Sequence, residues 1–479
     1  MTNTPDRSPH SSPPAMAGRQ ARRRLLLTTA TAWLLNACAG SPSMSNASTT
    51  DYPPIVFVHG NGDTAALWHT TVWRFESNGW PRERLHAIDM PYPLARDDDG
   101  KPQDGRTSTT EAMQYLSAEV DKVRKATGAP KVVLFGNSRG GNAIRNYIAN
   151  GGGSALVSHA ILGGTPNHGV WADKARLPNS EFNGTGPFLT ALNTTRLMGN
   201  DEVTPGVKWM TIRSDNNDKF AQPDGVWIGA KGTPTNVSFA GPELKGAENV
   251  VINGIDHRET SFSPKAFEQA YRFITGKAPA TLAITPEGSV VLNGKVSGLG
   301  LNNGPGAFVN NLPLTGATVE VFATRADSGE RVGAAVHTKL IGADGLWGPF
   351  TADGKASYEF VISMAGYATT HIYRAPFARS SNIINLRAER LADADKAAGS
   401  VVTFTRPRGY FGVPRDRISI DGISPPPGVP AGVAGVAQSK LKLDAAPPRP
   451  VVAEFNGERI VGRTWPAADN QVVLIELHQ

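Results

Sequence analysis

The sequence predicts an α/β domain built on a doubly wound, mostly parallel sheet, followed by an all-β region of the sandwich or barrel type. Three observations lead to this prediction. Apolar strand-like runs alternate with helix-like segments up to about residue 277. From about Thr281, short alternating strands and turns replace that pattern. With 479 residues, the chain is also long enough for two or three domains.

Residues 51–278 contain the elements expected of the parallel sheet. Helical periodicity marks three segments, 107–128, 139–150 and 263–276. Thr109 or Thr110 is expected to cap the first of these helices. Strands and helices that alternate in this way place helices on both faces of a parallel sheet. Two long connections, at about 165–206 and 219–247, lack strong periodicity, and loops of this length are usually functional or mobile. Six apolar runs are predicted to be strands: 55–60, 84–90, 131–135, 155–164, 207–213 and 248–254.

Residues 281–479 are expected to form the β-rich region, as one module or as two that divide near 395–400. Alternating apolar residues at 317–323 and 357–363 favour half-buried strands separated by turns. Six aromatic residues of this half are expected in a β-module core, although they would also suit a surface that binds lipid or polyester: Trp347, Phe350, Tyr373, Phe377, Tyr410 and Phe411.

The N-terminal residues have the pattern of an export signal. Three arginines precede an apolar stretch of about eleven residues, too short for a membrane span, which needs about 20. "RRRLL" resembles a twin-arginine signal, and "LNAC" resembles a lipoprotein signal-peptidase site. We therefore predict a signal peptide at 1–37, a tether at 38–50, and lipidation of Cys38, which would anchor the chain in outer-membrane or cell-surface lipid. Without that anchor, the exported protein would be secreted or periplasmic.

Charge and cysteine content exclude several classes. The formal net charge is +6, but residues 1–37 hold five arginines and one aspartate, so the remainder carries only +2. This leaves no basic footprint for nucleic acid. Cys38 is the only cysteine, which excludes an intramolecular disulfide. The sequence has no H-E-x-x-H, paired-cysteine or P-loop motif, and neither a metal nor an organic cofactor is expected.

A serine between two glycines follows the strand-like run at 131–135. The pentapeptide "GNSRG" ends at Gly140 and leads into the helical pattern at 139–150. Strand, tight turn and helix around G-x-S-x-G are typical of a nucleophile elbow. Glycines are needed because the turn is strained and side chains there would clash with neighbouring backbone. Ser138 is therefore the predicted nucleophile.

A serine hydroxyl needs a base within hydrogen-bond reach and a third group that orients the base. Such groups gather at the carboxyl ends of parallel strands. His257 follows the last predicted strand and is the predicted base. The acid is expected in the loop after 207–213, with Asp218 preferred and Asp224 or Asp215 as alternatives.

The reaction also needs hydrogen-bond donors for the developing oxyanion. The backbone N–H of Arg139, directly after the serine, is expected to be one. The loop after the first strand is expected to supply the second, from the N–H of Asn61, because Gly60 and Gly62 free the backbone there.

Three segments together resemble the bacterial lipase and esterase branch of the α/β-hydrolases: "FVHGNGDTAALW", "GNSRGG" and "INGIDHRE", in this order along about 225 residues. The segments "GIDHRETSFSPKAFEQAYRFITGKAPAT" and "HIYRAPFARSS" are similar to a two-domain lipase with a C-terminal β-barrel that binds lipid. The resemblance implies the same roles for Ser138, His257, Asn61 and Arg139. It also has a departure: where the two-domain lipase has its acid, this sequence has Gly163-Gly164.

The sequence thus predicts an exported serine carboxylic-ester hydrolase, a lipase or esterase, that acts through an acyl-enzyme. Two alternatives remain open. The same chemistry would suit a polyhydroxyalkanoate or polyester depolymerase whose C-terminal region binds the polymer. A lipoprotein that binds surfaces without catalysis would keep the fold, but the intact serine, histidine and glycine-rich loop argue against it.

Overall fold

The computed structural model describes residues 52–194, 200–299, 310–444 and 448–479. The described residues belong to the second of two units into which the chain divides, Thr49–Gln479. The predicted signal peptide, the tether and Cys38 lie outside the described residues. In the part of the chain that the structure describes, no helix is both long and apolar enough to span a membrane.

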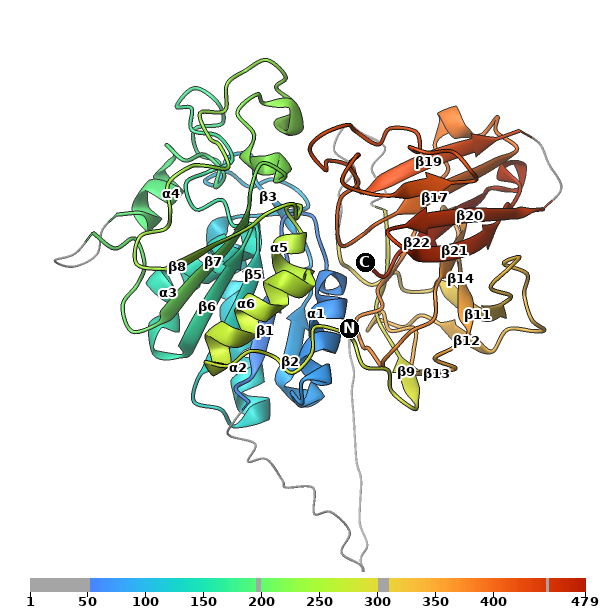
Figure 1. The fold of residues 1–479 in the computed structure, drawn as a ribbon, viewed down its shortest axis with the longest axis horizontal. Helices are drawn as coiled ribbons and strands as arrows, with labels where there is room; N and C mark the ends of the chain where they lie inside the picture. Colours follow the sequence, from blue (N-terminus) through green and yellow to red (C-terminus); the bar gives the residue numbers. More distant parts are fainter. Residues whose placement is uncertain (1–51, 195–199, 300–309, 445–447) are drawn as a thin grey trace, which may run out of the picture. The chain divides into compact units, whose positions relative to one another are not determined.

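A six-stranded parallel sheet is built from the first half of the second unit (Figure 1). The strand order is β2-β1-β5-β6-β7-β8, and every neighbouring pair is parallel. The predicted doubly wound sheet is thereby confirmed. All six strands fall within the predicted runs or extend them by one or two residues: β1 Ile55–Val58, β2 Leu85–Ile88, β5 Val132–Asn137, β6 Val157–Gly163, β7 Lys208–Ser214 and β8 Glu248–Ile252.

Helices cover both faces of this sheet. Alternation along β1 sends Ile55 and Phe57 into one core, with residues of α1 and α6, and Val56 and Val58 into a second core, with residues of α2 and α3. The α-helices of the described residues are α1 His69–Ser77, α2 Thr109–Thr127, α3 Arg139–Asn150, α4 Pro187–Leu192, α5 Glu259–Phe262 and α6 Pro264–Thr275. Two short strands, β3 Leu94–Ala95 and β4 Arg106–Thr107, pair with each other.

Helix α2 is capped by Ser108, not by Thr109 or Thr110 as expected. The N–H of Glu111 donates to Ser108 Oγ at 3.1 Å, and the N–H of Ser108 donates to the Glu111 carboxylate at 2.7 Å. This reciprocal capping box satisfies two backbone donors at once. It needs a glutamate three positions after the cap, and only Ser108 has one.

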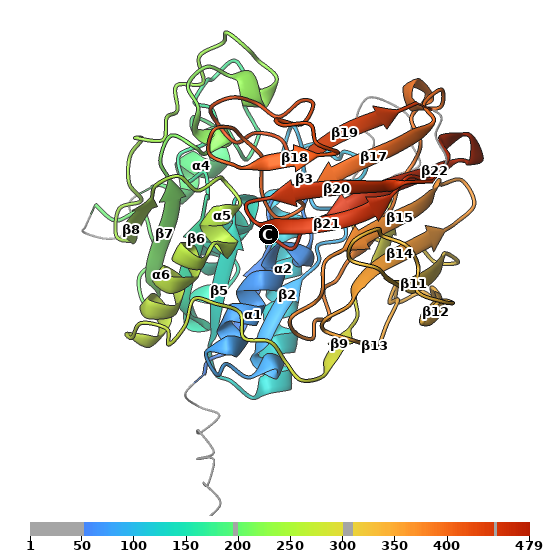
Figure 2. The same cartoon turned by 45° about the vertical axis from the view of Figure 1, so that its right-hand side comes forward.

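The second half of the unit is a β-rich region (Figure 2). Its largest sheet has seven strands in the order β12-β11-β14-β15-β22-β17-β19, and β22 pairs in parallel with both β15 and β17. Strands from both sides of residues 395–400 therefore belong to one sheet. The strands are β9 Val290–Leu292, β10 Val296–Gly298, β11 Thr318–Thr324, β12 His337–Leu340, β13 Phe350–Ala352, β14 Ser357–Ser363, β15 Thr369–Arg374, β16 Leu386–Ala388, β17 Ser400–Thr405, β18 Ile418–Ile420, β19 Gln438–Leu443, β20 Pro450–Phe455, β21 Glu458–Arg463 and β22 Gln471–Glu476.

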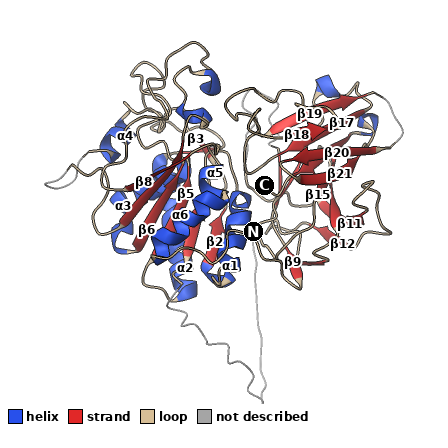
Figure 3. Cartoon of the chain, viewed as in Figure 1, coloured by secondary structure: helices blue, strands red, loops and turns tan. Residues whose placement is uncertain are grey.

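Each face of the seven-stranded sheet packs against a hydrophobic core. Along β22, Val472 and Leu474 belong to one core, and Val473 and Ile475 belong to another. The predicted β-rich C-terminal region is confirmed, and Figure 3 shows strands and loops, with almost no helix, through these residues. The six aromatic residues weighed above are all buried: Trp347, Phe350, Tyr373, Phe377, Tyr410 and Phe411.

Candidate active site

The predicted nucleophile occupies the turn between β5 and α3. The backbone of Ser138 has φ 52° and ψ −120°, and such a conformation costs a residue other than glycine about 1–3 kcal/mol. Two hydrogen bonds hold it. The N–H of Ser138 donates to the carbonyl oxygen of Gly163 at 2.8 Å, and the N–H of Gly141 donates to the carbonyl oxygen of Ser138 at 2.9 Å. The turn therefore holds the hydroxyl side chain at the carboxyl end of β5.

The glycines around the serine are required by close backbone contacts. A Cβ at Gly136 would come 2.7 Å from a backbone nitrogen of α3, and a Cβ at Gly140 would overlap the carbonyl oxygen of Val58. Gly60, after β1, also lies close to the serine, since its Cβ would be 3.1 Å from Cβ of Ser138. The absence of these side chains allows α3 and the loop after β1 to pack against the serine.

His257 and Asp218 meet in the segments that follow β8 and β7. Nδ1 of the imidazole lies 2.9 and 2.8 Å from the two carboxylate oxygens, and both side chains are buried. This contact assigns the imidazole hydrogen to Nδ1, which donates to the carboxylate. The N–H of Phe220 donates to the same carboxylate at 2.8 Å, and its ring packs edge-on against the imidazole, with centroids 4.7 Å apart. Nε2 of His257 is buried and has no hydrogen-bond partner among the described residues.

The other two candidate acids lie elsewhere in the loop after β7. Asp215 accepts hydrogen bonds from the N–H groups of Asn217 at 3.2 Å and Gly254 at 3.1 Å. Asp224 is exposed and accepts one from the N–H of Val226 at 3.1 Å. Both carboxylates thus cap backbone turns. The structure brings Asp218 to the histidine, and it does not bring the alternative Asp224 there.

Ser138 and His257 line the same cavity, of about 270 Å³. The two long connections, which have no periodicity in the sequence, supply much of its wall, and the C-terminal region supplies one residue. Five aromatic side chains make this wall suited to an apolar ligand: Trp171, Phe182, Phe220, Trp227 and Tyr410.

Asn61 lies in the turn after β1 and lines the same cavity. Its side-chain Oδ1 accepts a hydrogen bond from the N–H of Ala95 at 2.7 Å, which ties the glycine-rich loop to β3. Arg139 is the first residue of α3, and the first N–H groups of a helix have no partner within it. Both predicted oxyanion donors therefore lie in segments adjacent to Ser138.

The side chain of Arg139 has a role that the sequence did not reveal. Its guanidinium pairs with Glu181 at 2.9 Å, and both side chains are 3% exposed. It also donates to the carbonyl oxygens of Pro93 at 3.0 Å and Thr107 at 2.8 Å. The residue after the serine thus ties three other segments of the chain to the start of α3. Nothing in the local sequence marks Glu181 as its partner, because the two residues are far apart in the chain.

A cation and an aromatic ring stand beside the histidine. Nζ of Lys219 lies 3.9 Å from the ring centroid of Tyr410 and donates to the carbonyl oxygen of Gly435 at 2.9 Å. Burial, reinforced by the nearby charge of Arg258, lowers the pKa of Lys219 to about 8. Burial likewise raises the pKa of Tyr410 to about 12. In the sequence, Tyr410 is one of several aromatic residues of the C-terminal half, and no motif links it to this site.

Within the described ranges, no group of three or more histidine, cysteine, aspartate and glutamate side chains is arranged to hold a metal ion.

Comparisons with known families agree with this architecture. Residues 53–199 match the family model of the alpha/beta hydrolase fold, and residues 288–391 match that of the lipase C-terminal domain. The class of protein that the fold defines is therefore one with the α/β-hydrolase fold. More particularly, the hydrolase domain is followed in the same chain by a lipase C-terminal domain, so the resemblance to two-domain lipases is confirmed.

Several solved structures are similar to part of this chain. Aspergillus fumigatus lipase B is 12% identical, with a TM-score of 0.34, and the match covers 50% of this chain and 56% of that chain, little more than half of its length. Bacillus licheniformis lipase BlEst2 is 20% identical, with a TM-score of 0.31, over 47% of this chain and 89% of that one. Paleococcus ferrophilus monoacylglycerol lipase is 12% identical, with a TM-score of 0.30, over 47% of this chain and 96% of that one.

Proposed function

We propose that this α/β hydrolase cleaves carboxylic esters with Ser138 as nucleophile, His257 as base and Asp218 as the orienting acid. One observation carries the proposal. An imidazole whose Nδ1 is bonded to a buried carboxylate, and whose Nε2 has no partner among the described residues, lines the same cavity as a serine in a strained turn. A serine nucleophile needs a base with a free nitrogen and a carboxylate that orients this base, whereas a histidine with a purely structural role needs neither.

In the first half of the reaction, Ser138 Oγ attacks the carbonyl carbon of the ester, and the hydroxyl proton passes to Nε2 of His257. The carbonyl oxygen becomes an oxyanion, which the N–H groups of Asn61 and Arg139 stabilise. The tetrahedral intermediate then expels the alcohol, which takes the proton from Nε2. An acyl group remains esterified to Ser138.

In the second half, water attacks the acyl carbon and gives a proton to Nε2. The new tetrahedral intermediate collapses, the Ser138 oxygen leaves and recovers that proton, and the carboxylic acid is released. Asp218 keeps the imidazole in the tautomer that exposes Nε2 and stabilises the imidazolium in each transition state. The proposed steps use neither a metal nor an organic cofactor.

The proposed substrate is an ester with an apolar part, either a lipid or a polyester chain. The aromatic cavity wall supports this choice, because apolar surface removed from water contributes about 25 cal/mol per Å² to binding. Export, lipidation of Cys38 and a final place at the outer membrane or cell surface are further parts of the proposal, and they rest on the N-terminal sequence.

Hydrolysis of p-nitrophenyl esters from acetate to palmitate, beside the Ser138→Ala variant, tests the proposal. We expect activity that disappears in the variant and a chain-length optimum that separates esterase from lipase. Ser154→Ala is the matched control, because Ser154 lies in a surface 3-10 turn away from the cavity residues. Labelling with a fluorophosphonate should add mass only to the peptide that contains Ser138.

Failure on every ester and no labelling, in a folded protein, would reject the proposed function and favour a surface-binding lipoprotein. Labelling without turnover of small esters would instead direct the search to polyhydroxyalkanoate or other polyester granules.

A further inference from the structure

His257 lies in a short acidic segment whose side chains hydrogen-bond to its own backbone. Oδ1 of Asp256 accepts the N–H groups of Arg258 at 2.8 Å and of Glu259 at 3.0 Å. The Glu259 carboxylate in turn accepts the N–H of Asp256 at 2.6 Å. The segment 256–259 therefore forms one compact turn around the backbone of His257, and the position of this turn decides where the imidazole lies.

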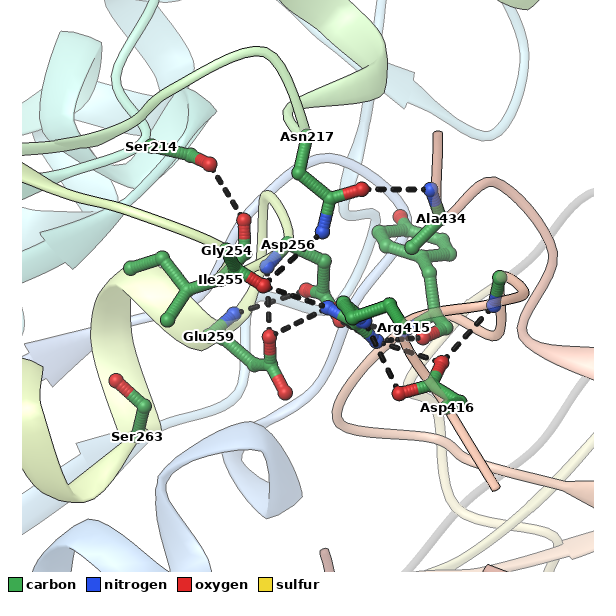
Figure 4. Close-up of polar contacts among 12 residues, drawn as sticks. Ser214, Asn217, Gly254, Ile255, Asp256, Glu259, Ser263, Arg415, Asp416 and Ala434 are labelled. Atoms are coloured by element: carbon green, nitrogen blue, oxygen red, sulfur yellow. Dashed lines mark hydrogen bonds and ion pairs between the residues drawn. The ribbon is translucent and has the colours of Figure 1, made fainter. Parts of the chain in front are cut away.

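Two arginines of the C-terminal region hold both carboxylates of this turn. Arg406 donates through Nη1 to Asp256 at 2.7 Å and through Nη2 to Glu259 at 2.6 Å. Arg415 donates to Glu259 at 2.8 Å and lies 3.6 Å from Asp256 (Figure 4). The N–H of Tyr410 completes the set with a hydrogen bond to Asp256 at 2.8 Å. Charge-assisted, paired bonds of this kind fix orientation as well as distance.

The pair formed by Asp256 and Arg406 is almost completely buried. Asp256 is fully buried, and the side chain of Arg406 is 3% exposed. Neither charge would remain there without the other, since removing one partner of a buried pair typically destabilises a protein by about 3–5 kcal/mol. The contact therefore cannot be an incidental surface pair, for which the median contribution is about 0–1 kcal/mol.

The arginines are themselves held by their own segment. Arg406 Nη1 donates to the carbonyl oxygen of Tyr410 at 2.9 Å, and Arg415 Nη2 donates to the same oxygen at 2.7 Å. Asp416 binds Arg415 and also accepts the N–H of Gly412 at 2.9 Å (Figure 4). Hydrogen bonds within segment 406–416 thus hold both arginines in place.

A second contact reaches the other end of the turn. Asn217 Nδ2 donates to the carbonyl oxygen of Gly254 at 3.3 Å, and its Oδ1 accepts the N–H of Ala434 at 2.9 Å (Figure 4). Asn217 directly precedes Asp218, so the C-terminal region contacts the chain beside both partners of the imidazole–carboxylate pair.

We propose that Arg406 and Arg415 are positioning residues of the active site, which hold the turn 256–259 so that His257 meets Asp218 and keeps Nε2 toward Ser138. The C-terminal β-rich region, through residues 406–416, then helps to position the active site. The expected effect of the two arginines on turnover rests on the proposed function. Their expected effect on the contact between His257 and Asp218 does not.

The test compares full-length Arg406→Met, Arg406→Lys and Arg415→Met with the wild type on p-nitrophenyl esters. Neither arginine lines the cavity of Ser138. In Arg406→Met we therefore expect kcat to fall about 100-fold, the loss that a displacement of about 1 Å can cause, and KM to stay within about twofold. The lysine variant keeps the charge but lacks the planar fork that reaches both carboxylates, so we expect it to recover only part of this loss.

Arg449→Met is the matched control. Arg449 makes a two-bond pair with Asp421, at 2.8 and 2.7 Å, within the C-terminal region and away from the histidine turn. Its loss should leave kcat unchanged. If Arg406→Met does not fold, Arg415→Met carries the same test, because it leaves the Arg406 bonds in place.

A second readout needs no substrate. The Nδ1–H that His257 shares with Asp218 should give a far-downfield proton resonance in NMR, identified by its absence from His257→Gln. We expect the resonance to weaken or vanish in Arg406→Met and to persist in Arg449→Met. An unchanged kcat, or a lower kcat with the resonance intact, would overturn the positioning role. If the wild type hydrolyses no ester, the proposed function fails, and the resonance alone then decides whether the arginines position the imidazole.

Discussion

Gly164 lies so close to His257 that a Cβ at this position would come 3.2 Å from Nδ1 of the imidazole and 2.8 Å from the carbonyl oxygen of the same residue. This is the place, at the end of β6, where related two-domain lipases are expected to carry the acid. In the present chain the histidine backbone and ring lie where a side chain at Gly164 would begin. The carboxylate that contacts the histidine comes from a neighbouring strand end, from Asp218 after β7.

Asp218→Asn should lower kcat about 10⁴-fold, because the amide favours the wrong imidazole tautomer while leaving the geometry intact. The chain supplies a matched control in Asp224→Asn, since Asp224 is exposed and makes its hydrogen bond to Val226. That variant should retain wild-type kcat. Steady-state kinetics on a single short ester would decide the matter, and equal losses in the two variants would reject Asp218 as the orienting acid.

Gly164→Ala should lower kcat by more than its loss of stability accounts for. The residue has φ 56°, and its Cβ would press on His257 and on Thr260 Oγ1 at 2.9 Å. We expect kcat to fall about 100-fold. Gly152→Ala is the control for backbone strain, because Gly152 has φ 81° and open space around it. It should lose about 1 kcal/mol of stability and keep its kcat. Wild-type kcat in Gly164→Ala would show that the close approach is not needed.

Lys219 gives the protein a dependence of stability on pH. Its pKa is about 8 in the folded protein and about 10.4 in the unfolded chain, so the unfolded state binds more protons between these values. The free energy of unfolding should therefore rise with pH in this window. Between pH 8 and pH 10 the lysine should contribute about 2 kcal/mol of this rise.

Urea denaturation of the wild type and of Lys219→Met at both pH values measures this contribution. The variant should lack that part of the increase. A wild type and a variant with parallel pH dependence would mean that the lysine remains charged in the folded protein.

Arg139→Met should destabilise the fold by about 3–5 kcal/mol, because it leaves the Glu181 carboxylate buried and unpaired. The double variant Arg139→Met/Glu181→Gln removes that charge as well and should recover part of the loss. Chemical denaturation of the two variants and the wild type measures the difference. Equal stabilities of the single and double variants would contradict a dominant role for the buried charge.

Much of the fold could be predicted because its signals are local. The strand-like runs and the helical periodicity agree with all six strands of the parallel sheet and with three of its long helices. Where two local signals competed, the prediction failed: Thr109 and Thr110 are as suitable as caps as Ser108, until the partner Glu111 is considered.

The candidate site was only partly predictable. Ser138 and His257 follow from motif and order, and so does the set of acids, since three aspartates share one loop. The choice among them depends on which carboxylate the loop turns toward the imidazole, and no spacing rule decides it. Glu181, Tyr410 and Arg406 were not assigned to the site, since each reaches it through contacts with residues far away in the sequence.

The sequence by itself determined the class of fold, the position of the strained serine turn and the order of the reacting groups, because periodicity and glycine placement act between near neighbours in the chain. Only the tertiary structure decided that Asp218 meets His257, that Arg139 ties three other segments of the chain to the start of α3, and that Arg406 holds the histidine turn from the C-terminal region. The physical reason is that a buried charge must find its partner wherever packing places one, and a partner about 150 residues away leaves no trace in the local sequence.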